Sequence, residues 1–125
     1  MRVIRLLLLL LLLATAAPAA QQPPAISLSL KPQVGYRPLN VAARIVIEPH
    51  YLNRGVCIVW ESSIYSGAGC WQVEGQYAPR AHTYTIKNLQ TPVDVTTVYT
   101  VRAELITVRD RIVTPTQLVQ VLHHF

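Results

Sequence analysis

Glycine is scarce in this chain, with five residues among 125, and none of them forms a glycine-rich loop of the kind that cradles phosphate groups. The six Asp and Glu residues stand apart, without D-x-D or E-x-x-H spacing. His50 follows a proline in a loop, His82 begins a strand-like segment, and His123 and His124 stand at the end of the chain. These absences predict a protein that is not an enzyme and that holds no metal or cofactor.

The chain also lacks any run of basic residues. It carries 11 Lys and Arg against 6 Asp and Glu, a formal net charge of +5, but the basic residues are scattered along the sequence. Nucleic-acid-binding proteins usually gather such residues in one patch. We therefore expect no nucleic-acid partner, while a mild attraction to anionic glycans or cell surfaces stays open.

The first residues follow the pattern of a secretory signal peptide. Two arginines in MRVIR precede eight leucines at 6–13, and an A-x-A site then ends at Ala19, with Ala16 as the other possible end. The alternative is an uncleaved membrane anchor, but the uncharged run is shorter than the roughly 20 residues of a spanning helix, and Pro18 follows it. We predict a signal peptide at 1–19, export to the periplasm or medium, and membrane contact only before cleavage.

Both cysteines and both tryptophans lie within residues 55–75. If Cys57 faces Cys70 across an antiparallel hairpin with its turn in 62–66, strand alternation separates the side chains into two sets. The inner face receives Val56, Ile58, Trp60, Trp71 and Val73, and the outer face receives Cys57, Val59, Glu61, Cys70, Gln72 and Glu74. Because one register satisfies both burial and pairing, we predict a Cys57–Cys70 disulfide, and no nearby histidine supports the alternative of a metal pair.

Apolar and polar residues alternate in most of the remaining segments, as they do in half-buried strands. The segments are 26–30, 39–48, 82–87, 97–108 and 112–122, and Pro115 makes the last one an edge strand or splits it. With the hairpin these give about seven strands, which predicts an all-β antiparallel sandwich. The expected core is Leu28, Leu39, Val41, Ile45, Ile47, Ile58, Trp60, Trp71, Tyr84, Ile86, Tyr99, Val101, Leu105 and Val119.

At several packing positions the chain resembles the immunoglobulin-like superfamily and, within it, the PKD-type domain. The matching segments are RPLNV at 37–41, Trp60, HTY at 82–84, and YTV at 99–101 followed by Asp110. The acidic, glycine-rich motif that usually follows the tryptophan of PKD domains is missing, and the expected disulfide lies within one hairpin instead of joining the two sheets. The resemblance implies an immunoglobulin-like sandwich that serves as a non-catalytic adhesion, spacer or ligand-binding module.

The expected organisation is a signal peptide at 1–19, a proline-rich lead-in at 20–25, an immunoglobulin-like domain at 26–122 and a free tail at 123–125. Candidate binding residues are the tyrosines expected in loops, since tyrosine offers a flat apolar face with a polar tip, together with two loop arginines. They are Tyr51, Tyr65, Tyr77, Arg54 and Arg80. Each tyrosine has the alternative role of a lid over the core.

These features lead to three hypotheses of function. The first is a secreted or periplasmic interaction module with a protein or glycan partner. The second is a small carbohydrate-binding domain that uses the loop tyrosines. The third is an inhibitor or accessory subunit of an exported enzyme, with a loop at 62–69 inserted into a partner cleft.

Overall fold

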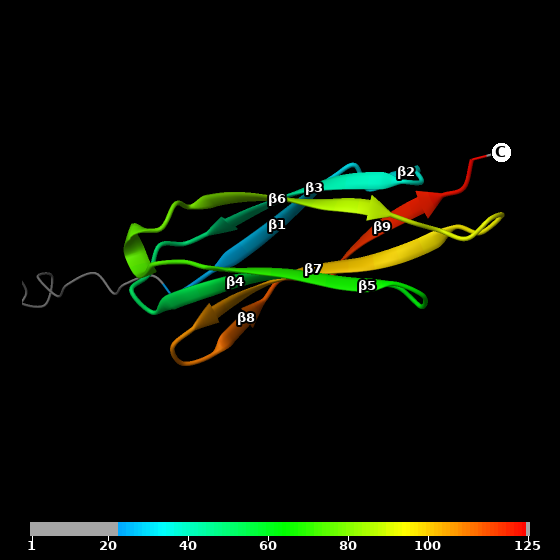
Figure 1. The fold of residues 1–125 in the computed structure, drawn as a ribbon. Coiled ribbons are helices and arrows are strands. Elements are labelled where there is room, and N and C mark those ends of the chain that lie inside the picture. The colour runs from blue at the N-terminus through cyan, green and yellow to red at the C-terminus, as the bar shows by residue number, and fades with distance from the viewer. Residues whose placement is uncertain (1–22, 125) are drawn as a thin grey trace, which may run out of the picture.

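The computed structural model describes residues 23–124, which fold into two facing β-sheets (Figure 1). The expected signal peptide and the start of the lead-in lie outside the described residues. A short 3-10 turn, η1 (Gly75–Tyr77), lies between β5 and β6. The strands are β1 (Ile26–Lys31), β2 (Val34–Tyr36), β3 (Leu39–Ile47), β4 (Asn53–Glu61), β5 (Ser66–Gln72), β6 (Ala81–Leu89), β7 (Thr97–Thr107), β8 (Arg111–Val113) and β9 (Gln117–Leu122).

The strand order is that of an immunoglobulin-like sandwich. The three-stranded sheet has the order β1-β3-β6, and the six-stranded sheet has the order β2-β9-β7-β4-β5, with β8 paired to β7. In immunoglobulin terms, the first sheet is A-B-E and the second is G-F-C with an added C′ strand. The fold class expected from the sequence is therefore confirmed.

One detail of the sheets differs from the expectation, and a second decides between two alternatives that the sequence left open. The connection at 31–38 contains β2, which pairs in parallel with β9, whereas the expected sandwich was antiparallel throughout. Prolines on either side of this short strand hide its pattern in the sequence. The last segment is split at Pro115, which was one of the two expected outcomes: β8 pairs with one half of β7 and β9 with the other half.

The β4–β5 hairpin has the register expected from the sequence. Cys57 pairs with Cys70, Val56 with Trp71 and Ile58 with Gly69, and the two sulfur atoms form a disulfide. At the turn, the N–H of Tyr65 donates to Oγ of Ser62 over 2.9 Å. Because β5 begins at Ser66, the segment Ser66–Gly69 is strand and not part of an inserted loop as the third hypothesis required.

Most of the expected core is buried, but three large rings are only half buried: Trp60 and Trp71 of the β4–β5 hairpin, and Tyr84 of β6. Trp60, Trp71 and Tyr84 line the flank of the sandwich between β5 and β6, which are edge strands of different sheets. Tyr84 stacks on Trp71 at a centroid distance of 5.7 Å and lies 6.0 Å from Trp60. These rings close the open flank, where among the described residues no further strand joins the two sheets.

Tyr99 is the largest fully buried side chain of the core. Its hydroxyl donates to the carbonyl oxygen of Gln90 over 2.7 Å, which ties the start of β7 to the connection before it. This arrangement is like the tyrosine corner of immunoglobulin-like domains. Burial raises the pKa of Tyr99 above its ordinary value, because the charged phenolate is poorly solvated there.

The C-terminal end of the described chain contacts β2. β9 ends at Leu122, and the ring of His124 stacks on that of Tyr36 at a centroid distance of 4.5 Å. His124 is therefore held against the sandwich, although the tail was expected to be free. Within residues 23–124 there is no helix with the length and apolar character needed to cross a membrane.

Candidate functional site

A groove of about 580 Å³ lies at one end of the sandwich, beside η1. Its lining comes from the start of β4 with the connection before it, and from the end of β5 with the connection that contains η1. Figure 1 shows both connections at the same end of the sandwich. The groove is lined by Tyr51, Arg54, Gln72, Val73, Glu74, Gly75, Gln76 and Tyr77. Three of these eight residues are among the five that the sequence suggested for binding.

The connection before β4 is held rigid by its own hydrogen bonds. Asn53 is fully buried, and its Nδ2 donates to the carbonyl oxygen of Glu48 over 2.9 Å. The N–H of Leu52 donates to Nδ1 of the buried His50 over 3.1 Å. With these groups turned inward, Tyr51 points outward with 51% of its surface exposed, and its ring stacks on His50.

The exposed side chain of Arg54 folds back onto the backbone of this connection. Its Nη1 donates to the carbonyl oxygens of Tyr51 (2.8 Å) and Asn53 (2.7 Å). A guanidinium carries five N–H donors in a fixed fork, so the donors on Nε and Nη2 remain for a ligand. Arg54 thus fixes the backbone beneath Tyr51 and presents a positive charge at the groove.

The other wall follows from the geometry of the chain after β5. The N–H of Val73 donates to the carbonyl oxygen of Arg54 over 3.1 Å, which joins the two walls. Gly75 has a φ of +55°, a conformation that side-chain-bearing residues rarely adopt, and it starts the η1 turn. The turn leaves Tyr77 with 87% of its surface exposed, so this ring is free to cover a ligand.

The groove combines aromatic faces with hydrogen-bonding groups. Glu74, Gln72 and Gln76 supply a carboxylate and two amides, and Arg54 supplies the positive charge. None of the eight lining residues is a serine, cysteine or histidine that would form a nucleophile–base pair. The arrangement is suited to holding a ligand by stacking and hydrogen bonds.

Two of the five residues suggested by the sequence lie outside the groove. Tyr65 follows the end of β4, whereas Tyr51 and Arg54 stand at its start, so nearly the full length of the strand separates them (Figure 1). Arg80 instead pairs with Glu48, with Nη2 3.1 Å from Oε2. Gln72, Glu74 and Gln76 line the groove but were not suggested from the sequence, although they stand just before Tyr77, which was.

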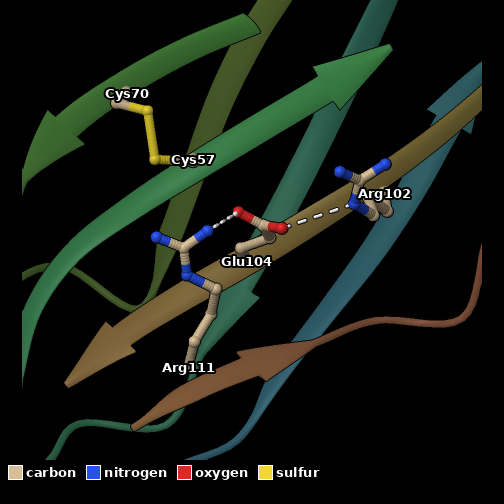
Figure 2. The surroundings of a disulfide bond; sticks show 5 residues. All are labelled: Cys57, Cys70, Arg102, Glu104 and Arg111. Carbon is tan, nitrogen blue, oxygen red and sulfur yellow. Dashed lines mark hydrogen bonds and ion pairs between the residues drawn. A yellow bond between two sulfur atoms is a disulfide. The ribbon is translucent and has the colours of Figure 1, made fainter. Parts of the chain in front are cut away.

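A second cluster of charged residues lies on the outer face of the six-stranded sheet, beside the disulfide. Figure 2 shows Glu104 between Arg102 and Arg111. Nε of Arg102 lies 3.3 Å from Oε1 of Glu104, and Nη1 of Arg111 lies 3.1 Å from Oε2. The Glu104 side chain is only 8% exposed, and Glu104 pairs with Cys57 across β7 and β4. Arg102 also contacts Glu61 over 2.9 Å.

The charges of this second cluster satisfy one another. Hydrogen bonding to Glu61, followed by hydrogen bonding and charge attraction from Glu104, raises the pKa of Arg102 above its ordinary value. A surface whose charges are already paired offers a ligand little, so we assign the cluster to the stability of the sheet. In residues 23–124 no group of three or more His, Cys, Asp and Glu side chains is placed to hold a metal ion.

Comparisons with known proteins identify no family for this chain. No protein-family model matches the chain, and no curated protein matches it. Among solved structures, one of murine CRIg is similar over 83% of this chain and 100% of that chain, with 15% sequence identity and a TM-score of 0.41. A likeness of that size carries no argument about ligands, so the immunoglobulin-like fold stands on the strand order and register of this chain itself.

Proposed function

We propose that the protein is an exported, non-catalytic interaction module of immunoglobulin-like fold that binds a protein or glycan partner in the groove beside η1. The observation that carries this proposal is the convergence of Tyr51, Arg54 and Tyr77 in one groove. Tyr51 and Arg54 come from the start of β4 and the connection before it, and Tyr77 comes from η1. Both tyrosine rings are exposed instead of lying over the core as lids. Exposed tyrosine and arginine side chains in a hollow are the residue types that dominate binding energy at interfaces.

Export is part of the proposal and has two supports. The leader-like pattern at 1–19 is one, and the Cys57–Cys70 disulfide is the other, since disulfides persist mainly in oxidising compartments. The PKD-type kinship within the superfamily is also proposed. In its favour, the segments at 37–41 and 99–101 that carry the resemblance supply the core residues Leu39, Val41, Tyr99 and Val101.

Partner capture tests the proposed function. The parent protein and the variants Tyr77→Ala, Tyr51→Ala and Tyr65→Ala are each immobilised and exposed to culture medium. In a second experiment, each of them is applied in solution to a glycan array. We expect each groove variant to weaken binding about tenfold or more, as removal of a central aromatic contact does. Tyr65→Ala is the matched control at the other end of the sandwich, and it should bind like the parent.

The opposite pattern would contradict the proposal. If Tyr65→Ala abolished binding while both groove variants bound normally, the hairpin tip would be the contact surface. That tip exposes Ile64 and Tyr65, and it is what remains of the inhibitor-like loop in the third hypothesis.

A carbohydrate ligand is the second candidate. Stacking faces on Tyr51 and Tyr77 stand next to the amides of Gln72 and Gln76, and sugars combine an apolar ring face with a rim of hydroxyl groups. Binding to neutral sugars on the array, lost in Tyr77→Ala, supports this candidate. An array without signal, together with capture of a protein, rules it out and leaves the groove as a protein-binding site.

A further inference from the structure

The free edge of β5 is unusually open for the edge of a sheet. Within residues 23–124, β5 (Ser66–Gln72, SGAGCWQ) pairs only with β4, and it contains no charged residue and no proline. Its seven register positions against β4 run without a bulge. Natural edge strands normally carry charges, prolines or bulges, or are short or covered, because an open edge pairs with other chains.

The other edges of the two sheets are blunted. β2 spans only three residues. The outward carbonyl of Leu28 in β1 accepts a hydrogen bond from Nε2 of Gln117 over 2.6 Å. β6 carries Lys87 and a register shift beside Asn88, whose φ is 58°. β5 has none of these devices.

Two hydrogen bonds at the ends of the hairpin show which backbone groups of β5 are free. The N–H of Val73 donates to Arg54 (3.1 Å), and the N–H of Ser62 donates to Tyr65 (2.7 Å). In an antiparallel pair, hydrogen-bonded and non-bonded positions alternate. Gly67, Gly69 and Trp71 therefore bond to β4, while the remaining residues direct their N–H and C=O groups to the free edge. These are Ser66, Ala68, Cys70 and Gln72.

We propose that this edge pairs with the same edge of a second copy of the chain, as antiparallel strands related by a two-fold axis through Gly69. In that register Ala68 faces Cys70 of the partner subunit, and Ser66 faces Gln72 of the partner subunit. All four outward residues of each strand then form hydrogen-bonded pairs, about eight bonds in total. The two six-stranded sheets become one continuous sheet.

The side chains of β5 fit a second copy of themselves. Gly67 faces Trp71 of the partner subunit, so the largest side chain of the strand meets a residue without a side chain, over which the indole of Trp60 lies. The axis passes between Gly69 and Gly69 of the partner subunit, a non-hydrogen-bonded pair in which the two backbones approach closely. Although the whole chain has a formal net charge of +5, the strand is uncharged, so the pairing brings no like charges opposite each other. Such a self-complementary contact closes at two subunits, because it uses the open β5 edge of both and leaves only blunted edges among the described strands.

Sedimentation of the exported full-length protein, from low micromolar to millimolar concentration, tests this pairing. We expect a monomer–dimer equilibrium in the parent and in Ala68→Ser, which keeps the backbone N–H and nearly the same size. Ala68→Pro removes an N–H that points to the free edge and not to β4, so the hairpin keeps its bonds. We expect Ala68→Pro to raise the dimer dissociation constant about hundredfold.

Hydrogen exchange of the parent protein gives a second readout that needs no variant. The amides of Ala68 and Cys70 should exchange quickly in dilute solution and become protected as concentration rises, while that of Gly69 is protected throughout. A monomer at every concentration, or a dimer that Ala68→Pro leaves intact, would overturn the proposal. So would protection of Ala68 and Cys70 that arises only when a different exported protein is added, because the edge would then serve a foreign strand.

Discussion

The indole of Trp60 lies directly against Gly67, its partner across the β4–β5 hairpin. A Cβ built on Gly67 would be 2.5 Å from Cε2 and Cζ2 of that ring. Tyr84 crosses Gly69 in the same way, with its hydroxyl oxygen 2.6 Å from the position of a Cβ. The two glycines thus let aromatic rings from both sheets fill the flank beneath β5.

This contact predicts that Gly67→Ala destabilises the fold. The added methyl group would force the Trp60 ring or β5 to shift, at a cost of about 1–3 kcal/mol in unfolding free energy. Gly55→Ala is the control in the same hairpin, because its Cβ would meet the nearest atom at 3.4 Å, and we expect it to cost less than about 1 kcal/mol. Urea unfolding measures both, and equal losses would show that the ring contact is not the cause.

The buried carboxylate beside the disulfide gives a second prediction. Glu104→Gln keeps the side-chain volume but turns an N–H group toward Arg102 or Arg111, so charge-assisted hydrogen bonds are lost. We expect a loss of about 1–3 kcal/mol. Glu61→Gln, at an exposed site with one of the same arginines, should cost about 0–1 kcal/mol. Chemical denaturation with and without added salt measures the unfolding free energy of both variants. If Glu61→Gln lowered it as much as Glu104→Gln does, the burial of Glu104 would not be the cause of the loss.

Tyr99 predicts a loss of stability in alkali. Since its pKa in the folded protein is raised by burial, the folded state favours the neutral phenol more than the unfolded chain does. The stabilisation that results from this difference in pKa is present in full below the pKa of tyrosine in the unfolded chain, about 10. It is lost as the pH rises through the pKa of Tyr99 in the folded protein.

The test compares the parent with Tyr99→Phe in melting experiments at rising pH. The variant loses the hydrogen bond to Gln90, worth about 0.5–1.5 kcal/mol near neutral pH. Above pH 10 the gap between the two melting temperatures should narrow. A gap that stayed constant across this range would mean that Tyr99 does not titrate with unfolding.

The disulfide supplies the fourth prediction. The mass of unreduced exported protein should be two hydrogens below that of the dithiol, and replacing both Cys57 and Cys70 with alanine should cost about 3 kcal/mol. The loss should act most on β5, which among the described strands pairs with β4 alone, so the amides of Gly69, Trp71 and Val73, which bond to β4, should exchange faster. Freely alkylated thiols in native exported material would contradict the pairing.

The β4–β5 hairpin could be predicted from the sequence because two independent demands agree on a single register. The sulfur atoms must meet, and Val56 and Ile58 must turn inward, and only the Cys57–Cys70 alignment does both. Strands β3 and β7 could also be predicted, because a long alternation of apolar and polar residues fits a half-buried strand and does not fit a helix.

The groove could not be read from the sequence in the same way. Arg54 and Arg80 look alike as loop arginines, yet one folds onto backbone carbonyls beside Tyr51 and the other pairs with Glu48. Which of these happens depends on how two connections from different strands meet, and local pattern contains no such information. The same is true of β2, whose only partner lies more than eighty residues further along the chain.

The most direct test of the binding groove is a map of amide chemical shifts in labelled protein as a captured protein or glycan is added. We expect the largest changes at 51–54 and 72–77, with 62–65 unchanged, and we expect Tyr77→Ala to remove them. Changes centred on 62–65, with the residues of the groove unaffected, would contradict the account.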